Sequence, residues 1–212
     1  MIHSKIELLF KEGTHLPLIE KFYTIQGEGY NVGKAAFFIR IGGCDIGCKW
    51  CDSKYSWKYG INSLVKTEEL ATEIIKSGYK NVVVTGGEPL MYNLDIFTKL
   101  LKKNNIKTYL ETSGTHNLSG VWDWISLSPK PHQPPKDIFF EIANELKVII
   151  YDIPSDLEWA EINSKKVKDK TYLYLQPEWS RKEINTPKIA DYIMKNTKWT
   201  LSVQLHKYIG LP

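Results

Sequence analysis

The chain has 212 residues, of which 42% are hydrophobic and 25% are charged. This balance permits a packed core and argues against a disordered chain. The net charge of +4 is spread along the sequence, so it suits an anionic ligand but falls short of a nucleic-acid-binding signature. Because no apolar stretch is long enough for a membrane helix and no signal-peptide pattern opens the chain, we expect one cytosolic domain over residues 1–212, with no membrane or nucleic-acid partner.

Apolar runs that fit strands alternate with stretches that fit helices. We predict helices at 67–77, 94–103 and 188–195, and strands at 35–41, 81–85, 107–111, 122–127, 146–151, 172–176 and 200–205. The link between the third and fourth strands is too short for a helical crossover, which needs about a dozen residues. We therefore expect an α/β fold with about six core parallel strands, arranged as a partial or modified TIM-like (β/α) barrel.

Polar motifs follow five of these strands directly. They are Arg40 with the loop that follows it in the sequence, Thr85-Gly86-Gly87-Glu88-Pro89, Glu111-Thr112-Ser113-Gly114-Thr115, Ser128-Pro129-Lys130 and Gln176-Pro177. Each motif alone is ordinary turn chemistry. Ligands of parallel barrels collect at the carboxyl ends of the strands, so the five motifs together predict one site there.

All three cysteines lie within one short loop, as Cys44, Cys48 and Cys51. An odd, clustered set does not form a disulfide framework, and a structural zinc site needs four ligands, for which only the distant His132 and His206 are candidates. Thiolates at C-x3-C-x2-C spacing favour an iron–sulfur cluster, and three ligands on a four-iron cluster leave one iron open. A zinc loop and three incidental thiols remain the alternatives.

The segment Cys44-Asp45-Ile46-Gly47-Cys48-Lys49-Trp50-Cys51 resembles the cysteine motif of radical S-adenosylmethionine (SAM) enzymes. The resemblance implies a 4Fe-4S cluster on the three cysteines, with its open iron chelated by SAM, in a barrel of the radical SAM type. The glycine-rich turn resembles the motif that binds the SAM amino group, and hydroxyls after the third strand suit a sugar or a carboxylate. The residues expected to bind SAM are Trp50, Gly86, Gly87, Glu88, Thr112, Ser113, Ser128, Pro129, Lys130 and Gln176.

The segment Phe22-Tyr23-Thr24-Ile25-Gln26-Gly27-Glu28-Gly29 resembles the opening motif of the 7-carboxy-7-deazaguanine synthases, and the likeness continues in order to Leu205-His206-Lys207. It implies a Mg²⁺-dependent lyase of queuosine (7-deazapurine) biosynthesis, which contracts the ring of 6-carboxy-5,6,7,8-tetrahydropterin with loss of ammonia. A guanidinium is the best partner for the substrate carboxylate, and amide and carboxylate groups suit a guanine-like edge. The residues expected to bind substrate are Ile25, Gln26, Gly27, Glu28, Arg40, Thr85, His206 and Pro212.

The resemblance also bears on metal and partners. The family usually has Cys-Asp-Thr where this chain has Cys51-Asp52-Ser53, and the serine keeps the hydroxyl that is expected to bind Mg²⁺. A homodimer and an electron donor such as a flavodoxin or ferredoxin are implied as well. The sequence suggests no side-chain acid or base for catalysis.

Two other functions compete with this interpretation. A radical SAM activating enzyme, which installs a glycyl radical on a partner protein, shares the cysteine spacing but has no need of Gln26, Glu28 and Arg40 to bind a small heterocycle. A non-catalytic zinc interaction module is supported only by the three thiols and the mild positive charge. Turnover of the pterin without a protein partner distinguishes the first alternative, and a colourless zinc-loaded protein would favour the second.

Overall fold

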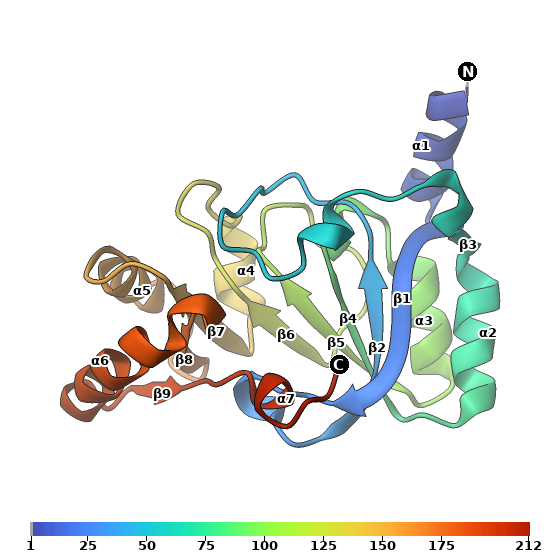
Figure 1. Ribbon diagram of the computed structural model, residues 1–212. Helices are drawn as coiled ribbons and strands as arrows, with labels where there is room; N and C mark the ends of the chain where they lie inside the picture. The colour runs from blue at the N-terminus through green and yellow to red at the C-terminus, as the bar shows by residue number, and fades with distance from the viewer. Residues whose placement is uncertain (1) are drawn as a thin grey trace.

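The computed structural model describes residues 2–212 and contains one curved, nine-stranded sheet (Figure 1). The strand order is β3-β1-β2-β4-β5-β6-β7-β8-β9, and the six pairings from β2 to β9 are all parallel. The parallel strands are β2 (Ala35–Ile41), β4 (Asn81–Gly86), β5 (Lys107–Thr112), β6 (Trp124–Leu127), β7 (Glu145–Ile150), β8 (Tyr172–Pro177) and β9 (Trp199–Leu201). This is the expected partial barrel, with seven parallel strands rather than about six.

Two antiparallel strands extend the sheet at one edge. β1 (His15–Ile25) pairs with β2, and the short β3 (Leu64–Lys66) pairs with the start of β1. Neither strand is among those predicted from the sequence. Because β1 runs opposite to its neighbours, its carboxyl end reaches the amino end of the parallel strands. Residues that follow β1 therefore approach the barrel interior from the side opposite to the cysteine loop.

Helices cover the outer face of the curved sheet, with α2 and α3 on one side and α5 and α6 on the other (Figure 1). Glu68 and Glu69 occupy the first turn of α2, and Gly78 ends it in the left-handed conformation, with φ of +78°. The helices are α1 (Ile2–Glu12), α2 (Thr67–Ser77), α3 (Asp95–Lys103), α4 (Asp137–Ile142), α5 (Ser155–Ser164), α6 (Lys182–Lys195) and α7 (Leu205–Tyr208). In the described chain, no helix is long and apolar enough to cross a membrane.

The main hydrophobic core lies between the sheet and these helices. It includes the fully buried Phe97 of α3, Phe139 of α4 and Leu146 of β7. The first six strand predictions are confirmed to within two residues at each end, because parallel strands are buried on both faces and read as continuous apolar runs. As predicted, no helix joins β5 to β6.

The last predicted helix and strand need correction. Helix α6 begins at Lys182, six residues before the predicted start, and contains Pro187 in its interior. The predicted strand at 200–205 is wrong beyond Leu201, because the chain leaves the sheet and starts α7 at Leu205. This departure turns the C-terminal segment back across the barrel, where the Leu205 N–H donates to the Gly27 carbonyl at 2.9 Å.

Candidate active site

A single cavity of about 460 Å³ gathers the polar motifs that the sequence places far apart. It spans the barrel interior from the cysteine loop to the segment after β1. Pro129 is the one predicted site residue that does not line it; its carbonyl instead accepts a hydrogen bond from the Trp159 indole at 3.4 Å. The predicted residues that line the cavity are Ile25, Gln26, Gly27, Glu28, Arg40, Cys44, Cys48, Trp50, Cys51, Ser53, Thr85, Gly86, Gly87, Glu88, Thr112, Ser113, Ser128, Lys130, Gln176, His206 and Pro212.

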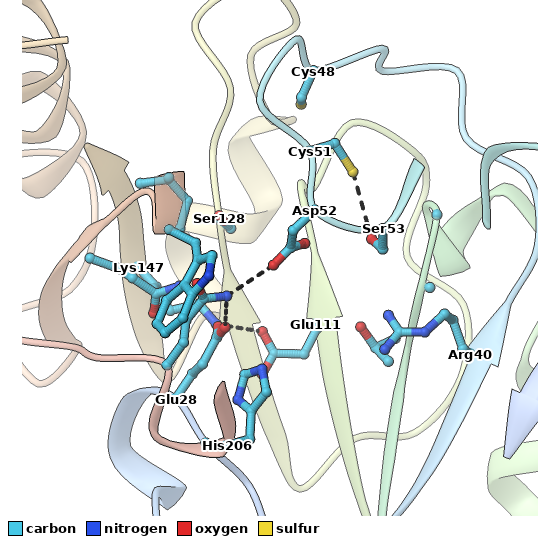
Figure 2. A pocket seen from close by; sticks show the side chains of 18 of the residues that line it. Glu28, Arg40, Cys48, Cys51, Asp52, Ser53, Glu111, Ser128, Lys147 and His206 are labelled. Atoms are coloured by element: carbon cyan, nitrogen blue, oxygen red, sulfur yellow. Dashed lines mark hydrogen bonds and ion pairs between the residues drawn. The ribbon is translucent and has the colours of Figure 1, made fainter. Parts of the chain in front are cut away.

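The cysteine loop forms one end of the cavity (Figure 2). It packs closely on the glycine-rich turn, because a Cβ on Gly87 would lie 2.0 Å from the Gly43 carbonyl oxygen. Burial raises the pKa of the Cys44 and Cys48 thiols, a penalty that metal coordination of the thiolate removes. Three soft thiol ligands on one loop, facing one cavity, fit an iron–sulfur cluster.

The two histidines that the sequence offers as a fourth zinc ligand have other neighbours. In the part of the chain that the structure describes, no three His, Cys, Asp or Glu side chains are arranged to hold one metal ion. His132 Nε2 instead bonds to the Ile46 carbonyl at 2.9 Å and thereby ties the cysteine loop to the segment after β6. His206 lies at the other end of the cavity, against Gly27. Neither histidine is a fourth ligand.

Glu88 is almost fully buried, with 1% of its surface exposed, and its carboxylate organises the turn after β5. One oxygen accepts from the Leu90 N–H at 3.1 Å and from Thr112 Oγ1 at 2.6 Å. The other accepts from the N–H and the Oγ of Ser113, at 2.8 and 2.6 Å. Because these four donors use the capacity of both oxygens, the carboxylate positions Thr112 and Ser113 within the cavity wall.

Lys130 and Trp50 lie together between the cysteine loop and β6. The Lys130 ammonium donates to Ser128 Oγ at 2.7 Å and lies 5.5 Å from the centre of the Trp50 ring. Burial lowers the pKa of Lys130, and the neighbouring Cys48 opposes that shift. A thiolate at Cys48 therefore gains a cation beside it.

Lys147 is buried at the other end of the cavity, with 5% of its side chain exposed, between two carboxylates (Figure 2). Its ammonium forms ion pairs with Glu28 and, at 3.0 Å, with Glu111. Gln26 joins the group by donating from Nε2 to Glu111 at 3.3 Å. Residues from β5, β7 and the segment after β1 thus form one polar wall.

The pKa values in this wall favour ion pairs. Burial opposes ionisation of Glu28, yet the charge of Lys147 lowers the pKa of this carboxyl from 4.5 to about 2. Burial likewise opposes the charge of Lys147, but Glu111 and Glu28 raise its pKa above its ordinary value. The wall therefore presents fixed charges at neutral pH and is suited to recognising polar edges of a ligand.

The C-terminal segment closes this end of the cavity. Gln204 Nε2 donates to Glu28 at 2.8 Å and to Asp52 at 3.0 Å, so it bridges the polar wall to the cysteine loop. Lys207 forms an ion pair with Asp52 at 2.5 Å. Burial lowers the pKa of His206, while the charge of Glu28 opposes that shift. His206 and Pro212, both expected to bind substrate, line the cavity at this end.

Arg40 extends into the cavity from β2 and is held on one side by Glu20. Its Nε donates to Glu20 Oε1 at 2.5 Å, and its guanidinium lies 6.0 Å from the ring centre of Phe22 and 5.7 Å from that of Tyr55. The bond through Nε fixes the side chain and leaves its two terminal nitrogens for an anion. Arg40 therefore lines the cavity with a geometry that suits an anion, although it also forms an ion pair with Glu20.

Ser53 lines the cavity beside the cysteine loop. Its Oγ lies 3.6 Å from Cys51 Sγ, and its carbonyl accepts from the Ser56 N–H at 2.9 Å. A hydroxyl is a hard oxygen ligand of the kind that Mg²⁺ accepts.

Several residues that line this site are not predicted from the sequence, above all Lys147 and Gln204. The signal for Lys147 was present, since it is the one charged residue between Leu146 and Ile150, inside an otherwise apolar run. A charge in a buried strand needs a partner, which marks it as part of a polar cluster. Gln204 had no such signal, because it lay inside a segment predicted as a strand.

Comparison with known proteins identifies the family. Residues 38–128 match the family described as the Radical SAM superfamily. The curated 7-carboxy-7-deazaguanine synthase of Flavobacterium psychrophilum is 48% identical over 212 residues, which is the whole of both chains. The chain belongs to the 7-carboxy-7-deazaguanine synthases.

Two other members of this synthase family are also similar to the chain. The Synechocystis sp. protein of that name is 45% identical over 195 residues, covering 92% of this chain and 93% of its own. The crystal structure of QueE from Escherichia coli is 32% identical and has a TM-score of 0.82, covering 96% of this chain and all of the other. The chain is therefore similar to members of the synthase family in both sequence and fold.

Proposed function

We propose that this chain is a radical SAM lyase that contracts the ring of 6-carboxy-5,6,7,8-tetrahydropterin to 7-carboxy-7-deazaguanine with loss of ammonia, in queuosine biosynthesis. One observation carries the proposal: a single cavity joins the three-cysteine loop to a wall of charged and amide groups that suits a guanine-like heterocycle. The family relationship over the full chain supports the same reaction.

We propose that the polar wall binds and orients the substrate. Glu28 accepts hydrogen bonds from the amino edge of the pterin, while Gln26 offers both a donor and an acceptor. Arg40 binds the substrate carboxylate through its terminal nitrogens, at the opposite side of the cavity in Figure 2. Thr85, Ile25, Gly27, His206 and Pro212 complete the enclosure.

Lys147 is proposed as a positioning residue for this wall. By pairing with Glu28 and Glu111, it fixes both side chains before substrate arrives, and its charge lowers the pKa of Glu28. Because these side chains are ordered before the substrate binds, they favour a bound substrate geometry close to that of the reaction.

We propose that Cys44, Cys48 and Cys51 hold a 4Fe-4S cluster and that SAM binds beside it. Trp50, Gly86, Gly87, Thr112, Ser113, Ser128, Lys130 and Gln176 line the surrounding wall. Since the Glu88 oxygens are already filled, the backbone of the glycine-rich turn and the hydroxyls that Glu88 orients are the groups left to contact SAM. When bound, the cluster and SAM supply the radical chemistry that removes a hydrogen atom from the substrate.

We also propose a Mg²⁺ ion, an external electron donor and a homodimer. The Ser53 hydroxyl supports the first, because it places a hard oxygen on the cavity wall near Asp52. A flavodoxin or ferredoxin is the kind of donor that reduction of the cluster requires. The homodimer rests on family resemblance.

The proposal is tested by anaerobic reconstitution with iron and sulfide, followed by incubation with dithionite, SAM, Mg²⁺ and 6-carboxy-5,6,7,8-tetrahydropterin. Mass spectrometry should detect 7-carboxy-7-deazaguanine without any protein partner. A brown protein that cleaves SAM but leaves the pterin unchanged contradicts the substrate and favours a glycyl-radical activating enzyme. A colourless, zinc-loaded protein contradicts the whole assignment.

A further inference from the structure

Strand β1 contains a bulge immediately before Glu20. Leu18 pairs with Ile41 of β2. The next pair joins Glu20 to Arg40, so two steps along β1 match one step along β2. In a regular antiparallel pair, Ile19 would lie opposite Arg40. The extra residue instead places Glu20 there, and directly opposite side chains lie on the same face of a sheet.

The two faces of β1 have different surroundings. Phe22 follows Glu20 by two residues, so it lies on the same face, and it lines the large cavity together with Arg40. Lys21 lies on the opposite face, where it forms an ion pair with Glu73 of α2. The bulge therefore directs a carboxylate toward the cavity side of the sheet, next to the arginine that is expected to bind the substrate carboxylate.

Glu20 lies beside Arg40 and is not among the residues that line the cavity. A single oxygen of its carboxylate, Oε1, accepts from Arg40 Nε at 2.5 Å and from the Tyr55 hydroxyl at 2.7 Å. Burial opposes ionisation of Glu20, but the bonds from Tyr55 and Arg40 outweigh it and lower the pKa of this carboxyl. Burial and the bond to Glu20 raise the pKa of Tyr55 to about 12, so its hydroxyl keeps the proton that it donates.

Tyr55 connects this pair to the cysteine loop. It belongs to the short helix η2 (Lys54–Trp57), which directly follows Ser53. Its ring centre lies 5.7 Å from the Arg40 guanidinium, and the ring of Phe22 lies 6.0 Å from the same group. Aromatic faces attract cations, so the rings help to hold the guanidinium. Arg40 is thus fixed at Nε while its terminal nitrogens reach into the cavity (Figure 2).

Glu20 has two opposite effects on binding of an anion at Arg40. An arginine that is ordered before the ligand arrives loses less conformational freedom on binding, and its fixed fork can donate two parallel bonds to a carboxylate. The negative charge of Glu20, however, weakens the attraction between Arg40 and an anion. Because both donors use the same Glu20 oxygen, the ordering requires an acceptor but no charge, and the two effects can be separated by substitution.

We propose that Glu20, held in turn by Tyr55, is a positioning residue that orients the Arg40 fork for the substrate carboxylate. Its contribution is orientation rather than charge, and it makes the cavity selective for a pterin that carries a carboxylate over one that lacks it. This inference rests on the proposed function. Neither Glu20 nor Tyr55 is among the site residues predicted from the sequence.

The test measures binding without turnover. Reconstituted protein with SAM and Mg²⁺ but no reductant is titrated by calorimetry with 6-carboxy-5,6,7,8-tetrahydropterin and with tetrahydropterin, which lacks the carboxylate. We expect Glu20→Ala to raise Kd for the carboxylated ligand about tenfold and to leave Kd for tetrahydropterin unchanged. Glu20→Gln should stay within about threefold of the wild type, because its amide oxygen accepts both donors. Glu73→Ala, which removes the surface partner of Lys21, is the matched control and should change neither value.

The possible outcomes separate this inference from the proposed function. If Glu20→Ala binds the carboxylated ligand as tightly as the wild type or more tightly, or if Glu20→Gln loses as much affinity as Glu20→Ala, the positioning role is wrong. A wild-type protein that binds neither pterin, or binds both equally, contradicts the proposed substrate site itself, and the positioning role fails with it. If Glu20→Ala does not fold, Tyr55→Phe removes the donor that holds Glu20 and should raise Kd for the carboxylated ligand about threefold. An unchanged Kd in that variant overturns the inference.

Discussion

The two halves of the active-site cavity are assembled in different ways. The proposed cofactor half consists of Cys44–Ser53, Gly86–Glu88 and Thr112–Ser113, short motifs at the ends of neighbouring parallel strands. The substrate half consists of Gln26, Glu28, Lys147, Gln204 and His206, which come from both ends of the chain and from the middle of a strand. Local motifs thus build the first half, whereas long-range contacts around a buried lysine build the second.

This difference has a physical consequence. The substrate half depends on ion pairs that are removed from water, so loss of one partner leaves an uncompensated buried charge. The cofactor half depends on backbone turns and on the Glu88 carboxylate, whose oxygens are already hydrogen-bonded. Its proposed function requires the iron–sulfur cluster that the three thiols would bind. Substitutions should therefore affect the two halves separately.

The largest effect is expected from Cys48→Ala. Removing one of three thiols should prevent stable cluster binding and abolish product formation. Iron and sulfide analysis with absorbance spectroscopy after reconstitution measures the loss, and circular dichroism verifies the fold. An unchanged cluster and full activity in this variant would contradict the assignment of the cysteine loop.

Lys147→Met should lower the free energy of unfolding without changing the structure of the cysteine loop. The substitution leaves the partly exposed Glu28 and Glu111, with 18% and 21% of their side chains exposed, without their cation, which costs up to about 3 kcal/mol in the free energy of unfolding. Denaturant unfolding measures this change, and Lys198→Met is the matched control because its ion pair with Glu161 is partly exposed and is worth about 1 kcal/mol or less. Equal effects of the two substitutions would show that the wall is not an ion-pair network.

Acid should unfold the protein partly through Glu28. Its folded pKa of about 2 lies below the ordinary 4.5, so its contribution to stability is present above pH 4.5 and is lost as the pH falls toward 2. The contribution is on the order of 3 kcal/mol. Stability measured from pH 7 to 2 should therefore fall less steeply in Glu28→Gln than in the wild type; parallel curves would contradict the low pKa.

Arg40→Lys should weaken substrate binding and spare the cofactor half. Lysine keeps the charge but loses the fork that binds a carboxylate, so we expect KM for the pterin to rise roughly 10- to 100-fold. Cluster content and SAM cleavage without substrate should match the wild type. Arg181→Lys, at the surface pair with Asp152, is the control and should leave KM unchanged. If the variant lost the cluster and substrate binding together, Arg40 would be needed for folding rather than for substrate binding.

The smallest effect is expected at Ser53. Ser53→Thr restores the residue usual in the family and should preserve the Mg²⁺ requirement, whereas Ser53→Ala removes the hydroxyl and should raise the Mg²⁺ concentration that gives half the maximal rate. Magnesium titrations of the initial rate compare the three proteins. Identical titrations for serine and alanine would remove Ser53 from the metal site.

The difference between the two halves of the cavity also explains which site residues can be predicted from the sequence. Cys44–Cys51 and Thr85–Pro89 are recognisable because each motif is contiguous and follows an apolar strand. Lys147 was missed because its neighbours describe a buried strand, and its partners lie 119 and 36 residues away. Gln204 was missed because β9 ends at Leu201. Contacts of such separation depend on topology, which the sequence pattern alone specifies only in outline.

The most direct test of the two-part cavity is Glu28→Gln, assayed for cluster content, SAM binding and 7-carboxy-7-deazaguanine in one reconstituted sample. Glutamine keeps the shape of the side chain, and Lys147 keeps its pair with Glu111. We predict a wild-type cluster and wild-type SAM binding, with product formation reduced at least 100-fold. Undiminished product, or loss of cluster and product together, would contradict the account.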